Sequence, residues 1–198
     1  MASFFLWEFS LPSTAVQLAG LVNTFFLFSF LGWVMECIVI SIQDKHFTLN
    51  RGFVHGPFCI IYGFGSMLGY LIMKPFSFNY VLLFCIGAVL ATAFEFLTAK
   101  LMLKFLGNLW WDYSKKPFNY KGILCLESTL FWGVVSVSLF AFLYDGVCSL
   151  ATKIPPFLAT KIAFLLVAYY AVDFAVSIYH SLCAKSEEEQ QTEKEDIA

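Results

Sequence analysis

The sequence predicts an all-α membrane protein, a polytopic bundle of about five transmembrane helices. Hydrophobic residues make up 60% of its 198 residues, and charged residues only 13%. Five windows with few charges are each near or above the roughly 17 to 25 residues that cross a bilayer as a helix. A soluble bundle of this length would lack the polar surface needed to enclose five such segments.

The five windows define one transmembrane domain over residues 15–183. Residues 1–14 precede it, and because they carry no basic region and no small-residue cleavage site, we expect them to lie at the membrane interface rather than to form a signal peptide. The acidic segment 184–198 lacks aromatic residues and is predicted to be a disordered tail. The expected spans are about 15–42, 57–73, 78–103, 123–144 and 157–183.

Turn residues and small residues mark the ends and faces of these spans. The second span follows a histidine-glycine pair, and Pro57 is predicted at its first helical position. The pattern from Gly65 to Gly69 in the same span is suited to close packing of helices in lipid. The third and fourth spans are joined by a loop at 104–121, and Pro155-Pro156 marks the start of the fifth.

Basic residues predict the orientation of the bundle. Five spans put the loops at 43–56 and 104–121 and the tail on one side, which carries most of the lysines and the arginine. By the positive-inside rule this side is cytoplasmic, so we expect the N-terminus outside, the C-terminus inside and the protein in the cell membrane. The basic residues are Lys45, Arg51, Lys100, Lys104, Lys115, Lys116, Lys121, Lys185 and Lys194 on this side, against Lys74, Lys153 and Lys161 on the other.

Four spans carry a carboxylate inside their apolar run: Glu36, Glu95, Glu127 and Asp173. A charge in mid-bilayer costs about 2.5 to 3.5 kcal/mol on the lenient insertion scale, so such residues face a bundle interior, a cavity or a partner charge. Three of these acids share a helix face with small or polar residues at helical spacing, and each such set forms a stripe. The stripes are Ser29, Gly32 and Glu36; Thr92, Glu95 and Thr98; and Asp173, Ser177 and His180.

The stretch "NRGFVHGPFCIIYGFG" places Arg51 and His55 immediately before the second span, on the side where the acids gather. Arg51 could therefore pair with Glu36, Glu95 or Glu127 and lower the cost of their burial. Two interpretations stay open: a structural clamp, or a site for a substrate headgroup or an ion.

The loop between the third and fourth spans contains Asp112 and Tyr113. Asp112 is expected to form a turn with Ser114, and the neighbouring lysines are expected to meet anionic lipid headgroups. A catalytic role for Asp112 or Tyr113 stays open because loops carry function. The sequence has no G-x-x-x-x-G-K-[ST], H-E-x-x-H or G-x-S-x-G motif, so we expect no nucleotide, metal or other cofactor. The net charge of −2 excludes the basic profile of a nucleic-acid binder.

Several of these segments together resemble the family of small integral membrane proteins called putative ABC-transporter type IV, or CmpB-like. The matching pieces are "FSFLGWVMECIVISI", "NRGFVHGPFCIIYGFG", "EFLTAKLMLKFLGNLWWDYSKKPFNYKGILCLES" and "FWG", within roughly residues 25 to 180. The resemblance implies a multi-pass membrane protein without naming an activity. The family pattern falls on Gly32, Trp33, Glu36, Arg51, Gly52, Gly56, Pro57, Tyr62, Gly63, Glu95, Trp111, Asp112, Tyr113, Ser114, Gly122 and Glu127.

These observations leave three hypotheses. The first is a membrane-transport component, an ABC-type permease-like subunit without its own ATPase, which acts with a second copy, a partner membrane subunit or a separate ATPase. The second is an intramembrane enzyme that acts on a lipid or isoprenoid headgroup, and the third is a structural or regulatory membrane protein. We favour the first, and with it a protein that is not an enzyme. The predicted polar pocket consists of Glu36, Arg51, His55, Glu95, Asp112, Tyr113, Glu127 and Asp173.

Overall fold

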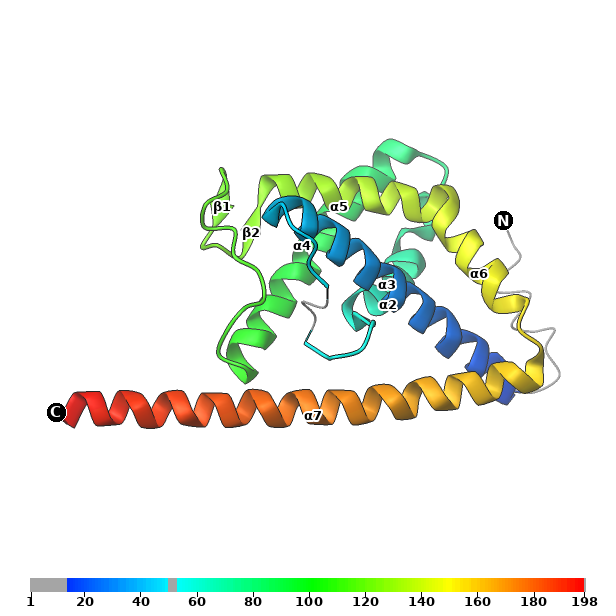
Figure 1. Cartoon of the computed structure of the whole chain (residues 1–198). Coiled ribbons are helices and arrows are strands. Elements are labelled where there is room, and N and C mark those ends of the chain that lie inside the picture. Colours follow the sequence, from blue (N-terminus) through cyan, green and yellow to red (C-terminus); the bar gives the residue numbers. More distant parts are fainter. Residues whose placement is uncertain (1–13, 50–52, 198) are drawn as a thin grey trace.

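The structure, a computed structural model, describes residues 14–49 and 53–197 and is almost entirely helical (Figure 1). The predicted interfacial segment lies, apart from Thr14, outside the described residues. In chain order the elements are α2 (Thr14–Asp44), α3 (Ile60–Met73), the 3₁₀ turn η1 (Lys74–Phe76), α4 (Tyr80–Phe105), β1 (Asn119–Tyr120), β2 (Leu124–Cys125), α5 (Leu126–Ser138), the π-helical segment η2 (Leu139–Leu143), α6 (Tyr144–Thr152) and α7 (Pro156–Ile197).

Four helical stretches are long and apolar enough to cross a membrane, and a fifth is shorter. The long ones are Thr14–Ile42, Tyr80–Phe105, Leu126–Thr152 and Pro156–Ser181, and the shorter apolar one is Ile60–Phe76. The predicted all-α membrane bundle is therefore confirmed, with a second span shorter than the others. The chain is a multi-pass membrane protein.

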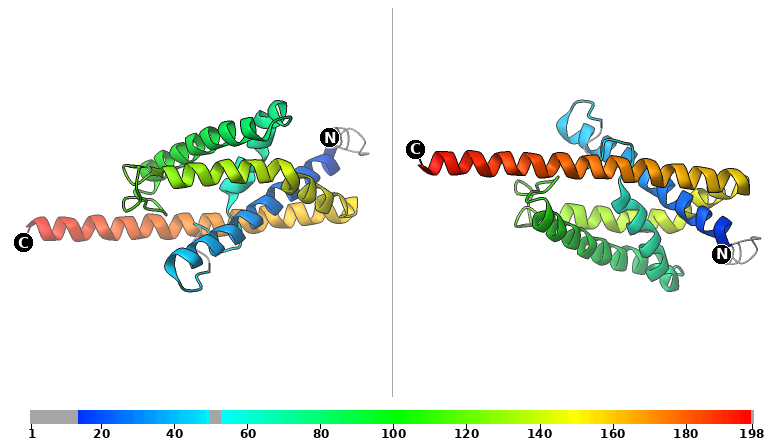
Figure 2. Two further views of the ribbon diagram at one scale, coloured as in Figure 1. Left: turned by 90° about the horizontal axis from the view of Figure 1, so that it is seen from above. Right: turned by 90° about the horizontal axis from the view of Figure 1, so that it is seen from below.

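The helices pack as neighbours in two groups. Helix α4 lies against α5, and α2 lies against both α3 and α7. The first turn of α2 and the last turn of α7 lie on opposite sides of the molecule (Figures 1 and 2). The chain bends where η2 joins α5 to α6, as expected where a wider helical turn interrupts an α-helix (Figure 1).

Close approach of α2 and α3 depends on two glycines. A Cβ atom at Gly32 would overlap with the ring of Tyr62. A Cβ atom at Gly63 would likewise overlap with side chains of α2. Within this chain, Gly65 and Gly69 make no such close approach: a Cβ at Gly65 would be 3.7 Å from its nearest neighbour and one at Gly69 would be 3.4 Å away, both ordinary contact distances. The small residues that matter are therefore Gly32 and Gly63.

Helix α3 begins at Ile60, not at Pro57 as predicted. The backbone N–H of Phe58 donates to the carbonyl of Gly56 at 2.8 Å, and that of Cys59 donates to the carbonyl of Ser29 on α2 at 3.0 Å. These bonds hold the chain against α2 in a non-helical path. The tertiary contact with α2 thus decides where the helix starts.

Helix α7 continues to Ile197, through the segment predicted to be a disordered tail. That segment is rich in glutamate, glutamine and lysine, which have high helix propensities. The prediction rested on its acidic charge and its lack of aromatic residues, which argue against a packed core but not against a continued helix.

Candidate functional site

Glu36 lies on α2 and accepts a hydrogen bond from the hydroxyl of Tyr62 on α3. Tyr62 can reach it because its ring lies over Gly32, one helical turn before the carboxylate on the same face of α2. The predicted stripe of Ser29, Gly32 and Glu36 therefore faces α3, and Ser29 is fully buried in that contact.

Glu95 is the buried acid among the described residues, with 8% of its surface exposed. Its carboxyl oxygens accept hydrogen bonds from the hydroxyl of Tyr113 at 3.0 Å, the hydroxyl of Ser128 at 3.1 Å and the indole N–H of Trp132 at 3.3 Å. Ser128 and Trp132 are one turn apart on α5, so α5 presents both donors to α4, while Tyr113 reaches in from the intervening loop. Burial and the nearby Glu95 carboxyl raise the pKa of Tyr113 above its ordinary value, which keeps its hydroxyl a donor.

The two acids belong to one cluster. The ring of Tyr62, which binds Glu36, lies 5.8 Å from the ring of Trp132, which binds Glu95. We call Glu36, Tyr62, Glu95, Tyr113, Ser128 and Trp132 together the Glu36–Glu95 cluster. Helices α2, α3, α4 and α5 all contribute to it.

The described donors to Glu36 and Glu95 are neutral. Within residues 14–49 and 53–197, no lysine, arginine or histidine nitrogen lies within 4.0 Å of a carboxyl oxygen of Glu36 or Glu95. The predicted partner, Arg51, lies outside the described residues, so its pairing stays a prediction.

Asp173 forms a second polar centre, between α7 and the turn before α3. It accepts hydrogen bonds from the backbone N–H of His55 at 3.1 Å, the N–H of Gly56 at 2.7 Å and the His55 ring at 3.1 Å. Ser177, one turn further along α7, lies 3.3 Å from the same ring nitrogen. The Asp173 side chain is 10% exposed, whereas that of His55 is 67% exposed. These bonds clamp α7 to the chain leading into α3.

Asp112 organises the loop between α4 and β1. It accepts hydrogen bonds from the backbone N–H and the hydroxyl of Ser114, both at 2.8 Å, as the predicted turn requires. These bonds lower the pKa of the Asp112 carboxyl. Gly122 packs against it with φ of +69°, and a Cβ there would come 2.9 Å from the carboxylate. The structure therefore gives Asp112 a role in shaping the loop that delivers Tyr113.

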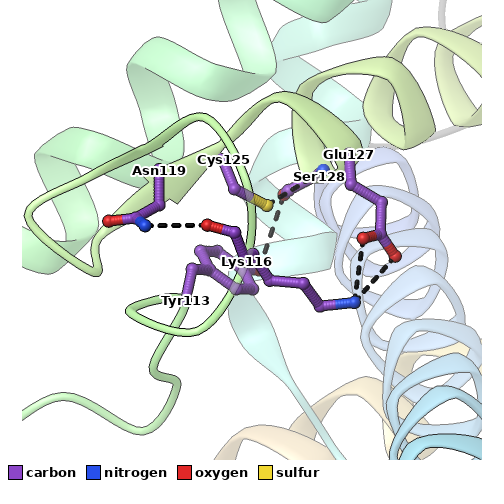
Figure 3. A network of polar contacts seen from close by, with 6 residues as sticks. All are labelled: Tyr113, Lys116, Asn119, Cys125, Glu127 and Ser128. Atoms are coloured by element: carbon purple, nitrogen blue, oxygen red, sulfur yellow. Dashed lines mark hydrogen bonds and ion pairs between the residues drawn. The ribbon is translucent and has the colours of Figure 1, made fainter.

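Glu127 lies apart from the buried acids, in the first turn of α5. Its side chain is 62% exposed and both its oxygens bind the ammonium of Lys116, at 3.0 and 2.8 Å (Figure 3). This bond raises the pKa of Lys116. Because α5 begins at Leu126 and not at residue 123 as predicted, Glu127 sits at the exposed end of the helix instead of within the apolar run. Figure 3 also shows the hydrogen bond of 3.4 Å from the hydroxyl of Tyr113 to that of Ser128.

The described surface includes two grooves near these residues. One of about 560 Å³ lies along the end of α2, where Trp33 and Ile38 face Phe47. The other, of about 380 Å³, lies between α4, the β-hairpin and α5. Neither of these two grooves is lined by Glu36, Glu95 or Asp173, so the polar pocket stays a prediction.

Sequence reasoning overlooked the donors that complete the cluster. Neither Ser128 nor Trp132 was among the predicted site residues, although both donate to Glu95. A usable signal existed, since a tryptophan in an apolar helix needs an acceptor for its indole N–H when it is buried. Among the described residues, no group of three or more histidine, cysteine, aspartate or glutamate side chains is placed to share a metal ion.

Comparison with known proteins agrees with this architecture. No curated protein and no solved structure matches the chain significantly. The sequence profile of the family described as "Putative ABC-transporter type IV" matches residues 23–178, a range that includes both acids of the cluster, Asp173 and the Asp112 loop. Because this match covers well over half of the chain, the protein belongs to the putative ABC-transporter type IV family of membrane proteins.

Proposed function

We propose that this protein is the membrane-embedded component of a transporter in the cell membrane, and that the Glu36–Glu95 cluster is where it handles its substrate or a coupling ion. The observation that carries the proposal is Glu95, a carboxyl 8% exposed in a membrane-crossing helix and held by hydroxyl and indole donors. Family membership supports the transporter class.

The chemistry of the cluster favours a proton or a cation as the species handled. Ionising a carboxyl inside a bilayer is costly unless a positive charge or several donors compensate it. Like charges repel strongly where the dielectric is low, so a cluster that contains two carboxyls favours the binding of a proton or a cation. Such a pair takes up or releases a proton, or a cation in its place, when the surrounding helices move.

Energy for transport would come from another chain. The 198 residues contain no G-x-x-x-x-G-K-[ST] motif, the phosphate-binding loop of ATPases. The long helices and the shorter α3 are few for a complete pathway. We therefore propose that the chain acts with a second membrane subunit, identical or different, and with a separate ATPase.

The proposed orientation puts the end of α2, the start of α3 and the loop of Asp112 on the cytoplasmic side. The excess of lysine and arginine on this side supports it. To test this orientation, a single cysteine is placed at Ser114 or at Ser149 of a cysteine-free protein and labelled with a membrane-impermeant maleimide. In intact cells Ser149→Cys should be labelled and Ser114→Cys protected; the reverse pattern would refute the orientation.

The test of function begins with the complex purified from crosslinked native membranes at native expression. It should contain an ATP-hydrolysing subunit, and in liposomes ATP should change the internal pH reported by a trapped fluorescent dye. Glu95→Gln should keep the partner but slow the pH change at least about tenfold, since that step loses its titrating group. Asp145→Asn, an exposed acid on α6, is the matched control and should leave the pH change intact. Purification without any ATPase, or equal rates for Glu95→Gln and wild type, would contradict the proposal.

A further inference from the structure

The groove of about 380 Å³ between α4, the β-hairpin and α5 faces outward from the bundle. Its floor contains Thr92 of α4 and Thr129 of α5, whose hydroxyls bind each other at 3.0 Å. Because these polar atoms satisfy each other, the floor offers an apolar surface at membrane depth. Its rim is formed by exposed apolar side chains, with Phe118 84%, Tyr120 53% and Leu126 47% exposed.

Two lysines stand at one end of this groove. Thr92, Phe96 and Lys100 follow at i, i+4 and i+8 on α4, so they share one face of the helix. The Lys100 ammonium lies 5.4 Å from the ring centre of Phe96, and that ring lies 6.4 Å from the ring of Tyr120. The Lys121 ammonium in turn lies 5.6 Å from the ring centre of Tyr120. Two positive charges therefore flank a pair of neighbouring aromatic rings, of which Tyr120 lines the groove, and we call this side of the groove its mouth.

The acids near this mouth are already engaged. Glu127 is bound by Lys116 and Asp112 by Ser114. Across the described parts of the chain, no carboxylate oxygen lies within 4.0 Å of the ammonium of Lys100 or Lys121. The mouth thus carries net positive charge that internal ion pairs do not neutralise.

The hairpin presents its rim in a fixed shape. Phe118 and Lys121 both have a left-handed backbone, with φ of +52°. The side chain of Asn119 holds this turn by donating to the carbonyl of Lys116 at 2.8 Å and by accepting from the N–H of Gly122 at 3.1 Å. The groove is therefore formed before a ligand arrives, which lowers the entropic cost of binding.

We propose that this groove binds one anionic phospholipid from the surrounding leaflet. The phosphate lies between the ammoniums of Lys100 and Lys121, and an acyl chain follows the groove to Thr92 and Thr129. From Thr92 to Lys100 is eight residues along α4, a rise of about 12 Å, which suits the distance from a headgroup to the middle of an acyl chain. A charged mouth and an apolar floor together favour a lipid over a second protein helix, whose surface in the bilayer would be apolar throughout.

Native mass spectrometry of the full chain tests the proposed lipid binding. The protein is released from mild detergent in the presence of one of two lipids that have the same acyl chains. Dioleoyl phosphatidylglycerol should stay bound at a higher occupancy than dioleoyl phosphatidylcholine. One lysine contributes about a fivefold change in affinity for an anionic lipid, so Lys100→Gln with Lys121→Gln should weaken phosphatidylglycerol binding about 25-fold and leave phosphatidylcholine binding unchanged.

Lys161→Gln is the matched control, because Lys161 also lies over an aromatic ring, at 4.1 Å from the ring centre of Phe157, but on the first turns of α7. It should not alter phosphatidylglycerol binding. Leu126→Trp, which fills the groove without changing charge, should also lower lipid occupancy, and inorganic phosphate should not displace the lipid.

Equal binding of the two lipids would overturn the proposal. So would an equal loss of phosphatidylglycerol binding in the Lys100→Gln, Lys121→Gln variant and in Lys161→Gln. Displacement by inorganic phosphate would show a free anion site instead. Disulfide crosslinking between copies carrying Leu126→Cys in native membranes would show that a second copy of the chain covers the groove, and would equally overturn it.

Discussion

Replacing Tyr113 by phenylalanine removes one hydroxyl and leaves the ring in place. That hydroxyl donates to Glu95 at 3.0 Å, the shortest bond the carboxyl receives. A hydrogen bond to a charged group contributes about 1.5 to 3 kcal/mol, and one between neutral groups about 0.5 to 1.5. Because Ser128 and Trp132 still donate at 3.1 and 3.3 Å, the carboxyl keeps partners, and we expect a loss of about 1.5 kcal/mol in the free energy of unfolding.

The assay is reversible unfolding of the full chain in mixed micelles, followed by tryptophan fluorescence. Tyr120→Phe is the matched control, because it removes a hydroxyl from the same loop where the side chain is 53% exposed. Its effect should stay within about 0.5 kcal/mol of wild type. Combining Tyr113→Phe with Glu95→Gln completes a double-mutant cycle, in which we expect a coupling of at least about 1 kcal/mol.

The prediction fails if the losses in the free energy of unfolding from Tyr113→Phe and Glu95→Gln are additive. It also fails if Tyr113→Phe is no more destabilising than Tyr120→Phe. Either result would mean that the loop does not deliver its hydroxyl to the buried acid in the membrane. Glu95 would then need another partner, and Arg51 would become the first to examine.

Three further predictions concern the contacts around the cluster. Gly32→Ala should destabilise the bundle by about 1 to 3 kcal/mol in the same unfolding assay because its methyl overlaps with a tyrosine ring, while Gly65→Ala should be tolerated at its 3.7 Å spacing. Asp173→Asn should speed amide hydrogen exchange of Gly56 at least about tenfold, since it weakens a charge-assisted bond; an unchanged rate would exclude the clamp. The Asp112 turn has a carboxyl pKa below the ordinary 3.8, so its stabilising effect is complete above that value and is lost as the pH falls through the lower, folded-state pKa. Amide exchange in this turn should accelerate there, and Asp112→Asn should abolish the pH dependence.

The sequence was sufficient to predict the elements because lipid imposes a simple rule on them. A segment of sufficient length and low charge forms a helix, since its backbone groups have no other partner in hydrocarbon. The stripes of Ser29 to Glu36 and Thr92 to Thr98 could also be found in this way, because helical spacing alone places their members on one face. Glu95 and Ser29 are indeed buried.

The partners of those acids could not be predicted, because spacing along one helix says nothing about which neighbour faces it. Glu36 binds a tyrosine from the next helix, and Glu95 binds residues 18, 33 and 37 positions away. Glu127 was misplaced for a related reason: the start of α5 is set by the preceding hairpin and not by hydropathy. The glycines that allow close packing were likewise decided by the crossing of α2 and α3.

By itself, then, the sequence determined that this chain crosses the membrane several times as helices and carries carboxyls within them, because hydrophobicity and length act locally along the chain. Only the tertiary structure decided that Glu36 and Glu95 share one cluster while Asp173 and Glu127 each belong elsewhere. That choice depends on helix crossings and on loop geometry, which bring together atoms far apart in sequence.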